Sequence, residues 1–241
     1  MPTRRVADCF QPSERPRCSL WLSALAFAIA AAHLALAPGY GYFRDEFYYL
    51  ACSRHLAFGY VDHPPLIAAV TALVTSALGS SLYALRFVPA LCAGAIAWLS
   101  GACAAELGAR RFGQLAAALT LSIAPLIAAF CSFLSMNALD VVVWGLSFWL
   151  ALRLLREATL MRWLSLGLVL GIGLENKLSV LWLGAGLAVG FIAYRRDLLR
   201  TRGPYLCAAL ALACLLPHVI WQARLGFPTL EFIHNARTLK M

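Results

Sequence analysis

The residues best suited to chemistry lie in one polar segment, residues 40–65, which is rich in aromatic and charged side chains. Within this segment Asp45 and Glu46 are adjacent acids. A carboxylate that aromatic and apolar neighbours partly desolvate holds a proton more tightly than it would in water. Such a group could act as a general base that removes a proton from an attacking hydroxyl. Asp45 and Glu46 are therefore the candidate catalytic residues.

A purely structural explanation of the same acids is also open. Four residues after the acids recur at helical spacing: Tyr48, Tyr49, Cys52 and Leu56. This spacing predicts a short amphipathic helix that begins near Asp45. Acids in a first turn stabilise a helix N-terminus, and aromatic side chains gather at membrane interfaces. On this interpretation the segment is a capped interfacial helix.

Two basic residues could hold a phosphate. Lys177 stands in the polar break Glu175-Asn176-Lys177 between two apolar runs. An ammonium group there could stabilise the negative charge that develops on a departing phosphate, or it could pair with Glu175. Arg86, near the end of another apolar run, could supply a second phosphate contact, or it could snorkel to the lipid headgroups.

Asp140 and His63 have open roles as well. Asp140 lies inside an apolar run, where an acid is costly unless it is paired or hydrated. It could be a helix-terminus acid, or it could converge with Asp45 to hold a divalent cation or a cationic substrate. His63 precedes two prolines that force a turn, and it could bind metal or substrate or simply lie at the surface.

The rest of the chain predicts a membrane protein that positions these residues. Of its 241 residues 62% are hydrophobic and 13% charged, and its mean hydropathy is +0.76. Soluble domains are about half apolar and a quarter charged. The apolar runs are 20–37, 66–78, 82–107, 114–134, 138–155, 160–174, 178–194 and 204–222. Because 66–78 is too short to span comfortably, we expect an interfacial or re-entrant helix there and about seven spans elsewhere.

The apolar runs also predict the division of the chain. We expect a cytoplasmic tail (1–19), a transmembrane domain (20–222) with its first outer loop at 38–65, and an outer segment (223–241). Pro38 directly follows the small residues that could mark a signal-peptide cleavage site, which favours a retained anchor. The pairs Gly167 with Gly171 and Gly186 with Gly190 are small-residue faces that predict close helix packing.

The basic residues predict the orientation. Thirteen of the 20 basic residues fall on the cytoplasmic side if the N-terminus is cytoplasmic, as the positive-inside rule requires. The loop 40–65, Asn137, Lys177 and the C-terminus then lie outside the cytoplasm. The net charge is +9, and most of the basic residues lie at the ends of apolar runs, where they orient helices. The sequence has no basic face interleaved with aromatic residues, so we do not expect a nucleic-acid partner. The eight cysteines form no CxxC pair, so they do not support a metal site.

Several motifs together resemble one enzyme family. Residues 43–50 (FRDEFYYL), 59–60 (GY) and 63–66 (HPPL) resemble the first-loop signature of bacterial family 39 glycosyltransferases. These are relatives of dolichyl-phosphate-mannose protein mannosyltransferases and of the lipid A aminoarabinose transferase. Supporting matches are 85–89 (LRFVP), 173–177 (GLENK), 216–221 (LPHVIW) and 226–232 (GFPTLEF).

The resemblance implies an all-helical bundle of the GT-C type and a polyprenyl-phosphate-linked sugar as donor. It implies inverting transfer of a hexose or pentose to a lipid or glycan acceptor on the outer face of a bacterial inner membrane. Asp45 corresponds to the catalytic acid, Glu46 to its neighbour, and Lys177 to the contact with the carrier phosphate. Arg44, Tyr48, His63 and Arg86 are expected to bind substrate. The second acidic position of the family falls on either Asn137 or Asp140.

Two other classes of function stay open. A transporter or flippase of lipid-linked substrates would also use intramembrane charge and helices broken by proline, although no internal symmetry of the two halves is evident in the sequence. Because family members usually run to several hundred residues, we expect the chain to correspond to an N-terminal portion. An inactive remnant that binds lipid without turnover is therefore the third possibility.

Overall fold

The computed structural model describes residues 20–239, and this part of the chain is almost entirely helical, without a β-strand. Its α-helices are α1 (Leu20–Ala35), α2 (Arg44–Ser53), α3 (Leu66–Leu78), α4 (Leu82–Glu106), α5 (Arg111–Ile123), α6 (Pro125–Phe130), α7 (Met136–Arg156), α8 (Leu160–Asn176), α9 (Val180–Tyr194), α10 (Gly203–Arg224) and α11 (Pro228–Leu239). Two short 3-10 helices are η2 (Ala37–Gly39) and η3 (Arg196–Arg200). The expected all-helical fold is confirmed. The expected tail, residues 1–19, lies outside the described residues.

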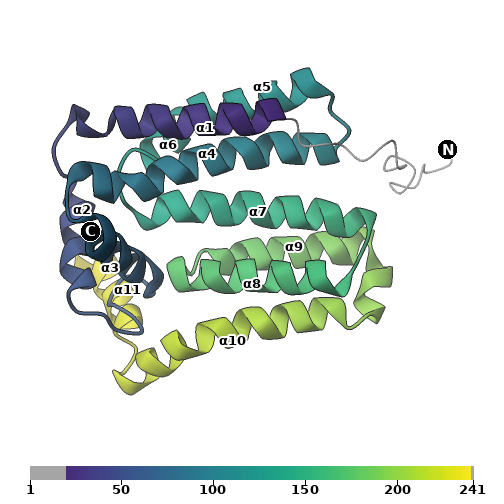
Figure 1. The fold of residues 1–241 in the computed structure, drawn as a ribbon. Coiled ribbons are helices and arrows are strands. Elements are labelled where there is room, and N and C mark those ends of the chain that lie inside the picture. The colour runs from purple at the N-terminus through teal and green to yellow at the C-terminus, as the bar shows by residue number, and fades with distance from the viewer. Residues whose placement is uncertain (1–19, 240–241) are drawn as a thin grey trace.

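Seven of these helices run side by side along one axis (Figure 1): α1, α4, α5, α7, α8, α9 and α10. Packing follows the order α1 and α5 against α4, then α7, then α8, with α10 against the far side of α8. The helices α2, α3 and α11 lie together at one end of the bundle, which we call the α2 end. This arrangement leaves the long helices to form the body and gathers the polar segment 40–65 at one end.

Four helices are long and apolar enough to cross a membrane: Leu20–Gly39, Leu82–Glu106, Met136–Arg156 and Gly203–Arg224. The helices α5, α8 and α9 are shorter but lie alongside them, so the count of seven spans stays a prediction. The sequence suggested one continuous span over the apolar run 114–134, but the structure has two helices there. Pro125 cannot continue α5, and Ala124 before it is extended, with φ −60° and ψ 122°. The chain therefore breaks into α5 and the short α6.

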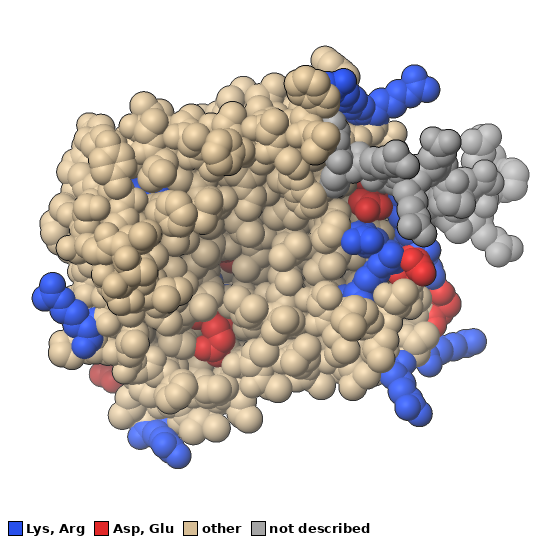
Figure 2. Space-filling view, in the orientation of Figure 1, with Lys and Arg blue, Asp and Glu red and all other residues tan. Residues whose placement is uncertain are grey.

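The two ends of the bundle differ in charge. We call the end opposite the α2 end the basic end. Its described residues include nine arginines and only three acids. The described part of the α2 end has six basic and six acidic residues. Figure 2 shows most of the visible charged side chains toward the two ends and a mainly uncharged surface between them. Such a belt between charged ends is the surface that a membrane-spanning bundle presents to lipid.

One expected small-residue face packs closely and the other does not. A Cβ atom added at Gly167 would lie 2.6 Å from the carbonyl oxygen of Cys207, and one at Gly171 would lie 2.7 Å from the Cβ of Cys214. This face therefore brings α8 and α10 into backbone contact, as predicted. The prediction for Gly186 and Gly190 is wrong, because nothing lies within 4 Å of a Cβ atom at either position.

We expect Gly167→Ala to destabilise the protein, because its methyl group would meet the backbone of α10. Overpacking of this kind costs roughly 1–3 kcal/mol. The measurement is the thermal unfolding midpoint in detergent. The matched control is Gly190→Ala on α9, whose methyl group enters open space and should leave the midpoint unchanged or raised. Equal midpoints for the two variants would contradict the close contact.

Candidate active site

The helix α2 positions the two acids of the first loop differently. Its N-terminus is fixed by the side chain of Glu46, whose Oε2 accepts a 2.7 Å hydrogen bond from the backbone N–H of Phe43. Glu46 points into the protein, on the same face as the buried residues Tyr49 and Cys52. The side chain of Asp45 is 31% exposed and contacts the exposed Arg44 at 3.3 Å. Asp45 is thus the acid that an external hydroxyl can reach.

Glu46 forms a buried ion pair with Arg86 of α4, and the exposures of the two side chains are 0% and 1%. The guanidinium donates to the two carboxylate oxygens over 3.1 Å each. It also donates to the carbonyls of Gly41 at 2.7 Å, Tyr40 at 3.2 Å and Ala37. We call this Glu46–Arg86 unit the buried clamp. Since every direction around the guanidinium is occupied, the expected phosphate contact and the alternative of snorkelling to lipid both fail to describe Arg86 here.

The buried clamp also reaches the chain before α7. The backbone N–H of Leu134 donates to Oε1 of Glu46 over 3.2 Å. Nearby, the ring of Phe133 lies 4.2 Å from that of Phe43, and Tyr49 packs in one apolar cluster with Leu134. We call residues 133–137 the connecting segment, and its first two residues are held against α2 and the residue before it.

The other end of the connecting segment holds Lys177. The Lys177 Nζ donates to Oδ1 of Asn137 over 2.8 Å and lies 3.8 Å from Oδ2 of Asp140. Next to it, Asn176 donates through Nδ2 to the carbonyl of Met136 over 2.8 Å. The Lys177 side chain is 36% exposed, so its ammonium can still reach a ligand. The alternative pair with Glu175 is not formed.

The family's second acidic position had two candidates, Asn137 and Asp140. Both contact the same ammonium group, from successive turns of α7. The carboxylate of Asp140 supplies charge to Lys177, and the amide oxygen of Asn137 fixes its direction. The two residues therefore share one task, which is to hold Lys177 in place.

Tyr48, Asp62 and His63 form a second polar group beside α2. The Tyr48 hydroxyl donates to Oδ1 of Asp62 over 2.6 Å. Partial burial and the Asp62 carboxylate raise the pKa of Tyr48, so the phenol stays protonated and keeps this bond. His63 is 2% exposed and lies within 5.6 Å of the rings of Tyr48, Tyr49 and Tyr60. The idea of a surface histidine is wrong, because the ring is enclosed by these tyrosines.

The expected cation site between Asp45 and Asp140 gains no support. Asp45 contacts Arg44, and Asp140 faces the ammonium of Lys177. Within residues 20–239 no group of three or more His, Cys, Asp or Glu side chains is placed to hold a metal ion. Magnesium is often held by one or two carboxylates, with water and phosphate oxygens as its other ligands. A divalent cation at this site therefore stays a prediction.

Sequence reasoning missed the polar contacts that join distant segments. The backbone N–H of Leu134 and the Asn176 amide had no signal in the sequence, because any residue carries a backbone donor and asparagine is common in turns. The pair of Tyr48 with Asp62 had a weak signal, since both lie in the same loop. The pairing of Glu46 with Arg86 was the more accessible one. An arginine and an acid, each next to an apolar stretch, are expected to find a partner.

Comparison with known proteins identifies a family match that covers much of the region described above. A sequence model of the family described as dolichyl-phosphate-mannose-protein mannosyltransferase matches residues 62–221, more than half of the chain. The matched range includes His63, Arg86, Asp140 and Lys177, and it begins after Asp45 and Glu46. No curated protein and no solved structure shows significant similarity to the chain.

Proposed function

We propose that this chain, which belongs to the dolichyl-phosphate-mannose-protein mannosyltransferase family, transfers a sugar from a polyprenyl phosphate to a lipid or glycan acceptor. Membership of the family makes the chain a membrane glycosyltransferase of the GT-C type. The identity of the donor and acceptor, the inverting course and the sidedness are the proposed parts. We place the α2 end outside the cytoplasm, because the basic end carries the excess of arginine that cytoplasmic loops carry.

One observation supports the proposal above the others. The connecting segment contacts both α2, which carries the accessible carboxylate of Asp45, and the accessible ammonium of Lys177, at the same end of the bundle. Displacement at a sugar carbon needs both groups, a base for the attacking hydroxyl and a positive charge for the departing phosphate. The rest of the polar network consists of groups that fix these two.

The proposed reaction proceeds by direct displacement. The acceptor oxygen forms a bond to the anomeric carbon while the carbon–oxygen bond to the polyprenyl phosphate breaks. Asp45 takes the proton from the acceptor hydroxyl, and the electron pair of the broken bond leaves on the phosphate. Lys177 stabilises that charge, and Asn137 and Asp140 hold its ammonium in place. An acceptor phosphate, already ionised, would need no base.

The experiment is a transfer assay in proteoliposomes that contain the purified protein and a labelled polyprenyl-phosphate sugar. We expect label in the acceptor, and we expect Lys177→Gln to lower the rate about 100-fold, the usual effect of removing one stabilising group at a developing anion. The matched control is Arg54→Gln, an exposed basic residue at the same end without an ionic partner in the described region. Movement of intact labelled lipid across the bilayer without a covalent product would identify a transporter and contradict the proposal.

A further inference from the structure

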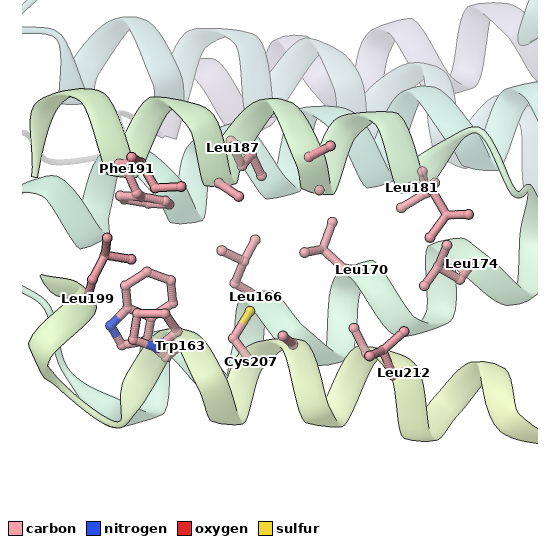
Figure 3. Close-up of a pocket in the computed structure, with 18 residues that line it drawn as sticks. Trp163, Leu166, Leu170, Leu174, Leu181, Leu187, Phe191, Leu199, Cys207 and Leu212 are labelled. Atoms are coloured by element: carbon pink, nitrogen blue, oxygen red, sulfur yellow. The ribbon is translucent and has the colours of Figure 1, made fainter. Parts of the chain in front are cut away.

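A cleft of about 310 Å³ opens between α8, α9 and α10. Figure 3 shows leucines and other apolar side chains from the three helices facing into it. Trp163 and Leu199 lie at one end of the cleft, and Leu174 and Leu181 lie at the other. The cleft is thus an apolar channel that extends along α8, α9 and α10.

Small residues create the cleft. The helix α9 contributes Gly184, Ala185 and Ala188 to its lining, and α10 contributes Ala208 and Ala211. While α8 and α10 meet backbone to backbone, α9 packs mainly on η3, α8 and α7. The space between α9 and α10 is therefore bounded by side chains too short to fill it. An apolar space open to the lipid-facing surface is suited to an acyl chain.

The end of the cleft at Trp163 has two polar features, the indole N–H of Trp163 and the N-terminus of α10. Trp163 is 3% exposed, and its Nε1 is buried without a hydrogen-bond partner. A Cβ atom at Gly203 would lie 2.5 Å from this nitrogen, so the N–H stands beside the N-terminus of α10. A buried donor that lacks an acceptor costs stability, and a helix N-terminus favours an anion. Together they indicate that an acceptor with negative charge belongs at this end.

Two arginines flank the same place. Arg200 ends η3 and Arg202 precedes α10, and both are exposed without an acidic partner in the described part of the chain. Between and beside them, Leu199 and Pro204 line the cleft. The apolar channel thus ends at the chain segment that carries these two exposed arginines. A ligand that fits both features carries a hydrocarbon chain and a phosphate.

From these features we propose that the cleft, with Arg200 and Arg202, binds an anionic phospholipid of the leaflet at the basic end of the bundle. One acyl chain lies along α8 between α9 and α10. The phosphate lies at Arg200 and Arg202, and a headgroup or ester oxygen accepts from Trp163. Basic residues at the mouth of a groove between membrane helices are the expected recognition for such a lipid. The proposed phosphate position lies toward the opposite end of the bundle from Lys177, whereas Leu174 and Leu181 at the other end of the cleft flank the chain break that holds Lys177.

The test measures quenching of Trp163 fluorescence by bromine atoms placed near the carbonyl end of the acyl chain. The purified protein is reconstituted into phosphatidylcholine nanodiscs with a small, equal fraction of brominated phosphatidylglycerol or brominated phosphatidylcholine. The Trp163→Phe variant isolates the signal of this residue from the other six of the seven tryptophans. We expect stronger quenching by the anionic lipid, with a preference that falls about fivefold for each arginine removed.

Two variants and their controls decide the outcome. Arg200→Gln with Arg202→Gln should abolish the preference, whereas Arg110→Gln, an exposed arginine elsewhere at the basic end, should leave it unchanged. Gly184→Leu should fill the cleft and reduce quenching, whereas Gly186→Leu should not, because Gly186 lies outside the lining and both positions have open space for a side chain. Equal quenching by the two lipids would overturn the proposed headgroup site. Absence of quenching of Trp163 by either lipid would overturn the proposal as a whole.

Discussion

Replacing Asp45 with Asn is expected to lower the rate of sugar transfer by about 10²–10⁴-fold, the range that a general base contributes. The amide has nearly the same size and shape as the carboxylate but cannot take the proton of the acceptor hydroxyl. Asp45 is 31% exposed, and its charged contact is with an arginine that is itself 90% exposed. The substitution should therefore leave the fold intact. The measurement is the initial rate of transfer in proteoliposomes, together with the thermal unfolding midpoint of the same preparation.

A matched acid at the same end of the bundle provides the control. Glu231 on α11 is exposed, and Glu231→Gln removes the same charge without touching α2. We expect this variant to transfer at the rate of the unmodified protein. An Asp45→Asn protein that transfers sugar at an undiminished rate would show that Asp45 is not the base for a hydroxyl acceptor.

The second large effect concerns stability. Replacing Arg86 with Met is expected to cost about 3–5 kcal/mol, the usual price of leaving one member of a buried ion pair without its partner. Glu46 would stay buried without its ionic partner, and the carbonyls of Ala37, Tyr40 and Gly41 would lose their donor. The measurement is the unfolding midpoint in detergent, followed by the transfer rate of whatever protein remains folded.

Two further variants separate the charge from the packing. Adding Glu46→Leu to Arg86→Met removes the stranded carboxylate, so the double variant should be more stable than Arg86→Met alone. The pair of Glu157 with Arg162 at the basic end serves as a control. The Glu157 side chain is 68% exposed, and Glu157→Gln should change the midpoint far less. If Arg86→Met were as mild as Glu157→Gln, the buried clamp would not be a main support of this end of the bundle.

The sequence was sufficient for the helical class because the composition leaves no alternative. Long apolar runs must bury their backbone polar groups internally when water is absent, and helices do so within one segment. The polar segment 40–65 was also recognisable, since eight of the 28 aromatic residues of the chain are concentrated there together with five charged residues. A proline accounts for the break in the helix that the sequence mispredicted. The break between α5 and α6 could have been predicted from Pro125, which lies within the run 114–134.

The direction of each side chain was not predictable in the same way. Asp45 and Glu46 are adjacent and chemically alike, yet one is accessible and the other has 0% exposure. Their separation depends on the rotation of α2 against α3 and α4, which is set by contacts with residues 40 and 88 positions away. Gly167 and Gly186 begin identical small-residue patterns, and only the first meets another helix. Such outcomes depend on which helices become neighbours, and periodicity does not contain that information.

The span of chain that the buried clamp connects has a consequence for biosynthesis. Glu46 completes its hydrogen bonds only when Leu134, 88 residues later in the chain, has reached the same end of the bundle. Helices α4, α5 and α6 must therefore be inserted before α2 acquires its final orientation. Until then the Glu46 carboxylate can pair with Arg86 of α4 but lacks the hydrogen bond from Leu134. The helix that carries Asp45 thus reaches its final orientation late in assembly, so a half-inserted chain carries this acid without the surrounding contacts.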